Sequence, residues 1–290
     1  MGKLLRGISK NGGVVFTALD STDIARQMRE YHDTSAVTSA ALGRLLTAAG
    51  LMGAMLKQKQ NSVTLRVDGG GPAGILLAVA DGAGHVKGYV QEPFAEMPPR
   101  ADGKLDVGGA VGRAGMLSVV KDLGMKEPYT GLTPLVSGEI AEDITQYYAV
   151  SEQIPTVCAL GVLVDRDLSI VCAGGYLIQL LPGATDGEIS LLEENVAQMP
   201  SVTAMLSQGT PLEAMMEKAL CGFEPEVLEY SQVQYACDCS RARVERALIS
   251  LGKEELRRLA AEEPMAKVSC QFCNREYCVD VPALLRGLGI

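Results

Sequence analysis

The chain has 290 residues and a formal net charge of −9, and 47% of its residues are hydrophobic although none is Trp. This length suits two domains, or one domain with a small appendage, and a sizeable core that needs no disulfides. The apolar content excludes an intrinsically disordered chain. The acidity argues against a protein built to bind nucleic acid phosphates. With only two histidines, His32 and His85, histidine-based catalysis has little support.

The first residues contain no apolar signal segment, and the longest apolar stretch, residues 40–56, is interrupted by Arg44 and by three glycines. We expect this stretch to form a buried helix rather than a membrane span. The protein is therefore expected to be cytoplasmic, with no membrane partner and with reduced thiols. Its eight cysteines then need an explanation other than structural disulfides.

Residues 1–180 predict an α/β core, and the chain as a whole predicts an α+β fold. A helix is expected from Thr22 or Asp23 to Tyr31, and a small-residue central helix over about 39–57. Alternating patterns predict strands over 63–68, 75–80, 85–91, 104–107 and 116–120. A helix is also predicted over 137–150, because acidic residues lie near the start of this segment, where the helix dipole favours them. Residues 157–164 and 168–181 predict a hairpin, so the core should be a mixed sheet with packed helices.

The composition changes near residue 181. Residues 179–231 contain nine acidic residues and one basic residue, Lys218, which is nearly the whole excess negative charge of the chain. Capping boxes at Thr185 and Glu188 and at Thr210 and Glu213 predict helices, the second with Pro211 at its first position. We therefore expect a helical linker over 181–231, followed by a C-terminal module over 232–290.

Four methionines lie in the predicted linker: Met199, Met205, Met215 and Met216. Their helical spacing favours core packing, although methionine surfaces also adapt to varied apolar partners.

The C-terminal module carries the strongest chemical signal, Cys237-Asp-Cys239 followed after 30 residues by Cys270-Gln-Phe-Cys273. Two close pairs of thiolates brought together by a folded-back segment suit a tetrahedral zinc site, and the segment contains a predicted helix over 253–261. A bound Zn²⁺ would supply folding free energy to a module too small to hold itself together. Arg241, Arg243 and Arg246 are expected to offset the negative charge of the four thiolates.

Two roles remain open for these four cysteines. The first is a purely structural zinc knuckle, although the 30-residue gap exceeds the ~15–20 residues of common two-knuckle modules. The second is a redox role, because each close pair is also able to form a local disulfide once the metal leaves.

The other signals are weaker. Cys158, Cys172 and Cys221 are expected to be buried packing residues, and Cys278 is either another packing residue or a fifth redox thiol. The glycine-rich run 69–74 matches a dinucleotide-binding pattern, but a strand pattern follows where a helix is needed, so a hairpin loop is favoured. His32 and His85 are expected at the surface or as capping residues.

Several motifs together make the chain similar to the heat shock protein 33 family of redox-regulated chaperones. The resemblance rests on the cysteine pattern and its gap, and on the sequences GRLLTAA at 43–49, SGEIAEDITQYY at 137–148, SEQIP at 151–155 and GGYLIQLLPGA at 174–184. One departure is visible, since the family often continues the second pair with Tyr-x-Phe, whereas Tyr277 is followed here by Cys278 and Val279. The number of redox-active thiols is therefore an open question.

The resemblance implies a chaperone that is not an enzyme, has no catalytic residues and carries one Zn²⁺ per chain on Cys237, Cys239, Cys270 and Cys273 when reduced. It implies that oxidation forms the disulfides Cys237–Cys239 and Cys270–Cys273, releases zinc and unfolds the linker. The active form, a homodimer, would then hold unfolding client proteins without ATP.

Two other classes stay open. A zinc-module protein that binds nucleic acid is disfavoured by the acidity of the chain, so no nucleic acid partner is expected. A thiol oxidoreductase using Cys270 and Cys273 is disfavoured because its motif would lie in a βαβ unit.

Overall fold

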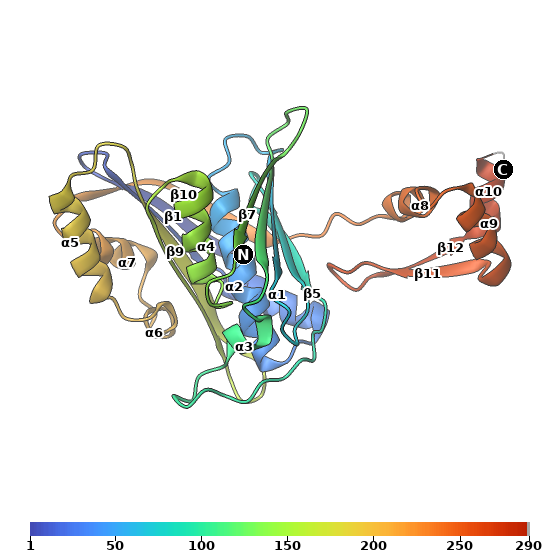
Figure 1. Cartoon of the computed structure of the whole chain (residues 1–290), viewed down its shortest axis with the longest axis horizontal. Coiled ribbons are helices and arrows are strands. Elements are labelled where there is room, and N and C mark those ends of the chain that lie inside the picture. The colour runs from blue at the N-terminus through green and yellow to red at the C-terminus, as the bar shows by residue number, and fades with distance from the viewer. Residues whose placement is uncertain (289–290) are drawn as a thin grey trace. The chain divides into compact units, whose positions relative to one another are not determined.

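The computed structural model describes residues 1–288 and divides into two compact units, Met1–Ala236 and Cys237–Ile290 (Figure 1). The fold is α+β, as the sequence predicts. The division expected from the sequence into segments 1–180, 181–231 and 232–290 remains a prediction, and each unit is described separately below.

The first unit is built on a ten-stranded sheet in the order β7-β6-β3-β4-β5-β10-β1-β2-β9-β8. The strands are β1 (Gly2–Ser9), β2 (Val14–Asp20), β3 (Ser62–Asp68), β4 (Leu76–Asp81), β5 (His85–Val90), β6 (Met116–Asp122), β7 (Tyr129–Pro134), β8 (Thr156–Val164), β9 (Ile170–Leu180) and β10 (Pro225–Tyr235). Neighbouring strands are antiparallel, except where β5 and β10 meet in parallel over two residue pairs. The sheet is therefore two five-stranded halves joined at a narrow seam.

Its helices are α1 (Thr22–His32), α2 (Ala36–Gly53), α3 (Val107–Val111), α4 (Ala141–Tyr147), the π-helix η1 (Tyr148–Glu152), α5 (Asp186–Ala197), α6 (Val202–Ser207) and α7 (Leu212–Ala219). The second unit contains α8 (Arg241–Ile249), α9 (Lys253–Glu262), β11 (Met265–Ser269), β12 (Glu276–Asp280) and α10 (Val281–Gly287). The helix predicted over 253–261 is confirmed as α9.

The buried helix predicted over 39–57 is confirmed as α2, but it starts and ends earlier. Ser35 caps it by accepting a hydrogen bond from the Thr38 amide at 3.3 Å, which fixes the start at Ala36. This helix has the length and hydropathy of a membrane span, yet 89% of it is buried inside the protein. Its small and aliphatic residues pack against strands on both halves of the sheet, as expected of a core helix.

Two local predictions were wrong. Residues 104–107 do not form a strand, because the Asp106 carboxylate accepts a hydrogen bond from the Gly109 amide and starts α3 at Val107. The helix predicted from residue 137 begins only at Ala141. The buried Asp143 carboxylate accepts hydrogen bonds from the amides of Val136, Ser137, Gly138 and Ile140, which holds these residues in a loop.

The remaining predicted strands of the core are confirmed within a few residues, as is the hairpin of β8 and β9. The glycine-rich run 69–74 joins the antiparallel strands β3 and β4, as predicted for a hairpin loop. His85 lies at a turn, where its Nδ1 is 3.0 Å from Asp81 Oδ2. His32 lies in the last turn of α1, but it is buried rather than at the surface.

The predicted helical linker contains three helices and then a strand. Thr185 and Glu188 form the expected capping box at the start of α5. The second box is absent, because Pro211 takes the N-cap position of α7 and offers no side-chain acceptor. Residues 225–231 were wrongly expected to be helical: they belong to β10, whose valine and tyrosine residues suit a strand paired with β1.

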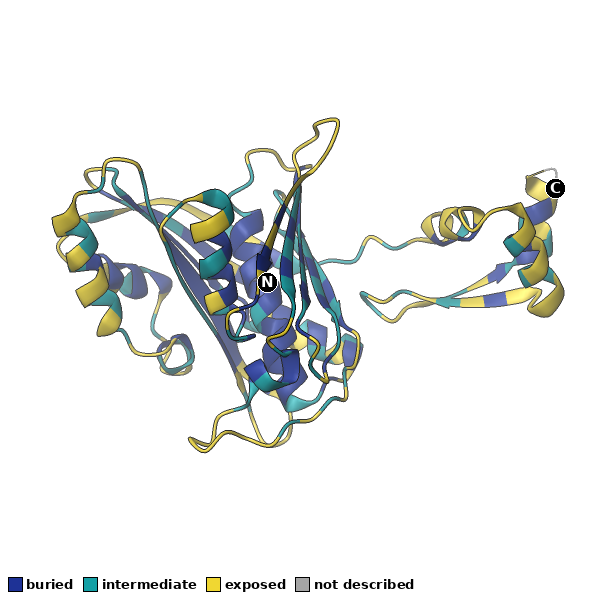
Figure 2. Ribbon diagram, viewed as in Figure 1, coloured by how far each residue is buried: buried dark blue, intermediate teal, exposed yellow. Residues whose placement is uncertain are grey.

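The helices α5, α6 and α7 cover the face of the sheet opposite α2 (Figures 1 and 2). They enclose a second apolar cluster with β1, β2 and β9, in which the rings of Phe16 and Tyr176 stack at 5.6 Å. Met205, Met215 and Met216 are buried in this cluster and Met199 packs at its margin, which confirms the core-packing interpretation.

Candidate metal centre

The four cysteines of the C-terminal motif come together from two loops of the second unit. Cys237 and Cys239 lie just before α8, whose start is fixed by Ser240, which accepts a hydrogen bond from the Arg243 amide. Cys270 and Cys273 lie in the turn between β11 and β12, the only two strands described in this unit. The turn closes through hydrogen bonds from the Cys270 amide to Arg275 O at 3.0 Å and from the Asn274 amide to Cys270 O at 2.8 Å. Asn274 has φ +54°, a conformation that asparagine tolerates well.

The four sulfur atoms fit a tetrahedral metal ion. All four lie within 4.8 Å of one another, and the Cys237–Cys270 and Cys239–Cys273 sulfur pairs are 3.6 and 3.4 Å apart. Zn–S bonds of ~2.3 Å place sulfur atoms about 3.8 Å apart at the corners of a tetrahedron. All four residues are half-buried, and no disulfide joins them. The sequence reasoning therefore selected a set of residues that the fold does bring together.

Tyr277 supports this cluster from β12. Its hydroxyl donates a hydrogen bond to Cys239 Sγ at 3.0 Å. Burial opposes ionisation of Cys239, but the hydrogen bonds from Tyr277 and neighbouring thiols outweigh it and lower the pKa of this thiol to about 7. Burial raises the pKa of the Cys237 and Cys273 thiols. The contacts of Cys239 therefore favour its thiolate form, whereas burial disfavours the thiolates of Cys237 and Cys273.

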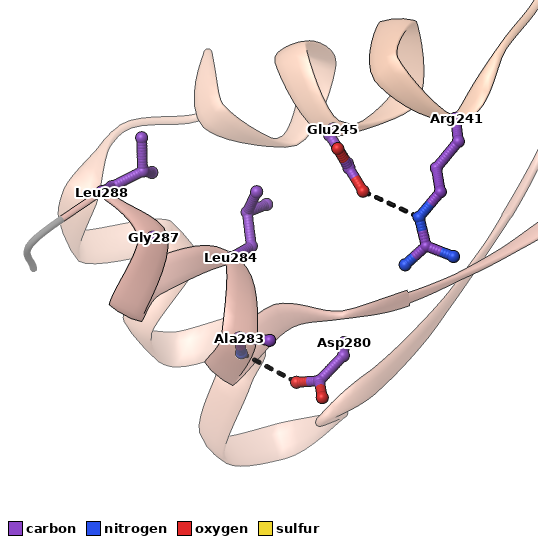
Figure 3. A pocket seen from close by; sticks show the side chains of 7 residues that line it. All are labelled: Arg241, Glu245, Asp280, Ala283, Leu284, Gly287 and Leu288. Atoms are coloured by element: carbon purple, nitrogen blue, oxygen red, sulfur yellow. Dashed lines mark hydrogen bonds and ion pairs between the residues drawn. The ribbon is translucent and has the colours of Figure 1, made fainter.

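Arg275, which the sequence reasoning missed, adds positive charge near the sulfur atoms. The hydrogen bond with Tyr277 and the charges of Tyr277, Cys239 and Cys273 raise the pKa of Arg275. Arg243 pairs instead with Asp238. Arg241 pairs with Glu245 at 2.8 Å and lines a pocket with Asp280 and residues of α10 (Figure 3). The position of Arg275 two residues after Cys273 was a usable signal, because the turn folds it back onto the motif.

The remaining cysteines lie outside this cluster. Cys172 is buried, as predicted, and its Sγ lies 3.5 Å from the carbonyl oxygen of Thr203 in α6. Cys158 is half-buried on β8 and packs against the main core, and burial raises the pKa of its thiol. Cys221 and Cys278 are exposed. The packing role predicted for Cys221 is therefore wrong, and of the two roles considered for Cys278 the packing role does not fit. Cys221 follows the end of α7, and Cys278 lies on β12, on the face of that strand opposite the buried Val279.

Four thiols in this geometry are able to hold one metal ion, and the chemistry of the donors favours zinc. Soft thiolate ligands in a tetrahedral set are typical of structural zinc and of iron–sulfur sites. The half-buried positions also leave the sulfur atoms open to oxidants in solution.

Comparison with known proteins gives a consistent result over the whole chain. The sequence model of the Hsp33 protein family matches residues 2–280. A 33 kDa chaperonin of Clostridioides difficile is 45% identical over 98% of both chains, and one of Clostridium perfringens is 46% identical over 95% of this chain and 87% of its own. The crystal structure of the 33 kDa chaperonin of Thermotoga maritima, a heat shock protein 33 homologue, is 34% identical. It matches with a TM-score of 0.91 over 99% of this chain and 98% of that chain.

Proposed function

Because the chain belongs to the Hsp33 family of chaperones, we propose that it is a redox-regulated holdase, which binds unfolding proteins without ATP after oxidation of Cys237, Cys239, Cys270 and Cys273. The single observation that carries this proposal is the cluster of four sulfur atoms in a module with a small core. The relatives are named chaperonins rather than enzymes. We also propose a cytoplasmic location, unfolding proteins as partners, a homodimeric active form, and no nucleic acid or membrane partner.

In the reduced protein, these four thiolates would hold one Zn²⁺. The ion would crosslink the loop before α8 to the β11–β12 turn and so stabilise the module. Tyr277 would keep its hydrogen bond to the Cys239 sulfur and so fix the position of this ligand. Arg275 would offset part of the negative charge of the thiolates.

Oxidation would convert the ligands into two disulfides and so remove the metal site. The proposed pairs, Cys237–Cys239 and Cys270–Cys273, join residues that are close in sequence, so each closes only a very short loop. Such loops restrict the unfolded chain little. They therefore would not replace the crosslink between the two loops, and the module would lose order.

The surface that would take up clients lies beneath the linker helices. Side chains of β1, β2 and β9, including Leu5, Phe16 and Tyr176, pack against methionines of α6 and α7. Loss of the linker would expose this face, which is apolar and accepts chains of varied sequence. The negative charge of the linker would favour its extended state once it has left the sheet.

Aggregation of a chemically unfolded client, followed by light scattering, tests the proposal. Peroxide-oxidised protein should suppress scattering without ATP, whereas reduced, zinc-loaded protein should not. Zinc content and free thiols measured on the same samples should show one zinc per reduced chain, and its release with the loss of four thiols. Equal protection by the reduced and oxidised forms would point to a constitutive binder instead.

Hydrogen exchange on the same two forms tests the proposed path of unfolding. Exchange should accelerate together in the linker helices α5, α6 and α7 and in the C-terminal module on oxidation, while the strands of the sheet stay protected. A linker that stays protected in the active form would contradict the proposal.

A thiol oxidoreductase is a weaker alternative. Cys270 and Cys273 lie at the tip of an antiparallel hairpin, not between a strand and a helix of a βαβ unit. Insulin reduction by the reduced protein with dithiothreitol would favour this alternative, and we expect no turnover.

A further inference from the structure

The strand β8 ends the sheet in an open edge that carries no charged residue. Among the described residues its strand partner is β9 alone. The opposite end of the same half-sheet is different: β10 carries Glu226 and Glu229, and a β-bulge leaves Leu228 unpaired between its partners on β1. Charges and bulges protect an edge strand against pairing with other chains, and β8 has no charge along its nine residues.

A groove of about 640 Å³ lies along this edge. Residues 160–164 of β8 form its floor. On the α2 side it is lined by Arg44, Glu139 and the loop that contains Arg100 and Lys104, and on the linker side by the start of α6, residues 201–203. Its volume is in the range of ~300–1000 Å³ typical of ligand pockets.

The backbone of β8 presents alternate residues to this groove. The Leu180 amide donates to Pro155 O, and the register continues with Thr156 opposite Gln179. Hydrogen-bonded and non-hydrogen-bonded pairs alternate along an antiparallel ladder. Ala159 and Gly161 therefore direct their N–H and C=O groups to β9, whereas Leu160 and Val162 direct theirs into the groove.

We propose that this edge binds an extended segment of an unfolding client, which adds to the sheet as a further strand beside β8. The inference rests on the proposed chaperone function and names a second contact for its clients. Strand addition uses main-chain hydrogen bonds, so it tolerates varied sequences, and the apolar side chains of β8 favour a segment with alternating apolar residues.

The walls of the groove decide between possible occupants. While α6 is in place, lining residues rise on both faces of the sheet, so a second copy of the chain would bring its own two walls against these. A segment free of tertiary structure meets no such obstacle. Charge does not select the occupant, because the cations of the rim are already paired. Arg100 and Lys104 both pair with Asp102, and Glu139 pairs with Arg44 and Arg100 in the same groove.

One wall belongs to the linker, so the groove is coupled to the proposed switch. A Cβ atom on Gly161 would lie 2.7 Å from Thr203 Cγ2, which shows how closely α6 approaches the edge strand. Departure of α6 would widen the groove. Binding of a segment should therefore be weaker in the reduced protein than in the oxidised protein.

The test uses full-length protein, reduced and oxidised, and a synthetic peptide of alternating valine and threonine with a glutamate at each end. Amide exchange at single residues should slow by about tenfold or more at Leu160 and Val162 when the peptide is added, and remain unchanged at Ala159 and Gly161. The same peptide, N-methylated at every peptide bond, should have no effect. Because the charges of the rim are paired, a lysine-ended version of the peptide should protect the same two amides.

Three results would overturn the inference. The first is unchanged exchange at Leu160 and Val162, and the second is equal protection by the N-methylated peptide. The third is protection that grows with protein concentration alone together with dimers in sedimentation, which would assign the edge to a second copy. The aggregation assay separates this inference from the proposed function. If only oxidised protein suppresses aggregation but the peptide does not protect Leu160 and Val162, this inference alone is wrong. If the peptide protects these amides but reduced and oxidised protein suppress aggregation equally, the proposed switch alone is wrong.

Discussion

The two compact units bury very different amounts of apolar surface. Met1–Ala236 encloses two large clusters, one on each face of its sheet, with α2 buried along nearly its whole length. In the described part of Cys237–Ile290, one cluster of seven buried side chains lies beside four half-buried thiols. A small core rarely holds a module of this size without a metal or a crosslink. The comparison indicates that packing stabilises the first unit, whereas the second has a small core, and under the proposed function a metal ion on its sulfur atoms would stabilise it.

The largest effect should follow from removing the sulfur ligands. Replacing Cys237, Cys239, Cys270 and Cys273 by serine should abolish zinc binding, a loss on the order of 10 kcal/mol of folding free energy in the second unit. Elemental analysis and hydrogen exchange would measure the two effects. Replacing Cys158 and Cys172 by serine is the matched control and should leave zinc content unchanged. A quadruple variant with a fully protected second unit would contradict the dependence on metal.

Two leucine truncations compare the cores directly. Leu46→Ala in α2 and Leu256→Ala in α9 each remove a fully buried side chain, at a cost of about 2–5 kcal/mol. Leu256→Ala should also weaken zinc binding, because folding of the second unit and metal binding are linked. Competition with a chelator would measure this. Equal zinc affinity in the two variants would show that metal binding by the four cysteines does not depend on the apolar core of the second unit.

A smaller effect is expected where the linker meets the sheet. In Gly161→Ala the added Cβ atom would meet Thr203 and Val202 of α6, and such overpacking costs about 1–3 kcal/mol. Part of the holdase activity should then appear in the reduced, zinc-loaded protein. Gly187→Ala in α5 is the control, since its Cβ atom would have no neighbour closer than 4.0 Å. If the variant showed no holdase activity when reduced and no change of hydrogen exchange in α6, tight packing of α6 against β8 would be contradicted.

The smallest effect concerns pH and the start of the linker. Backbone and side-chain hydrogen bonds from Thr185, and one from Asn11, lower the pKa of Glu188. The folded-state pKa lies below the unfolded value, so this contribution is complete above the ordinary glutamate range and is lost as the pH falls below it. Protection factors of amides in α5, which correct for the intrinsic pH dependence of exchange, should therefore fall below about pH 4. In Glu188→Gln the pH dependence of protection in α5 should disappear. If the variant and the original protein showed the same pH dependence, the Glu188 carboxylate would not be its cause.

The sequence predicted those elements whose signals are local. Capping at Thr185, helix α9 and the strands β3 to β6 depend on neighbouring residues, and the structure has them close to the predicted bounds, whereas β1, β2 and β7 were not predicted. The close spacing within each cysteine pair likewise indicated the candidate ligands before any fold was known. These features need only a few residues to act together, so the chain specifies them without its tertiary context.

The tertiary structure decided what depends on residues far apart. Asp143 delays α4 by taking the amides of the preceding loop, and β10 is a strand because β1 lies beside it, although its acidic residues suggest a linker. Tyr277 and Arg275 join the sulfur cluster only through the fold of the β11–β12 turn. The open edge of β8 exists only because the order of strands leaves it last. Strand pairing and side-chain packing between residues far apart in the sequence depend on the free energy of the whole fold, so a local sequence pattern does not predict them.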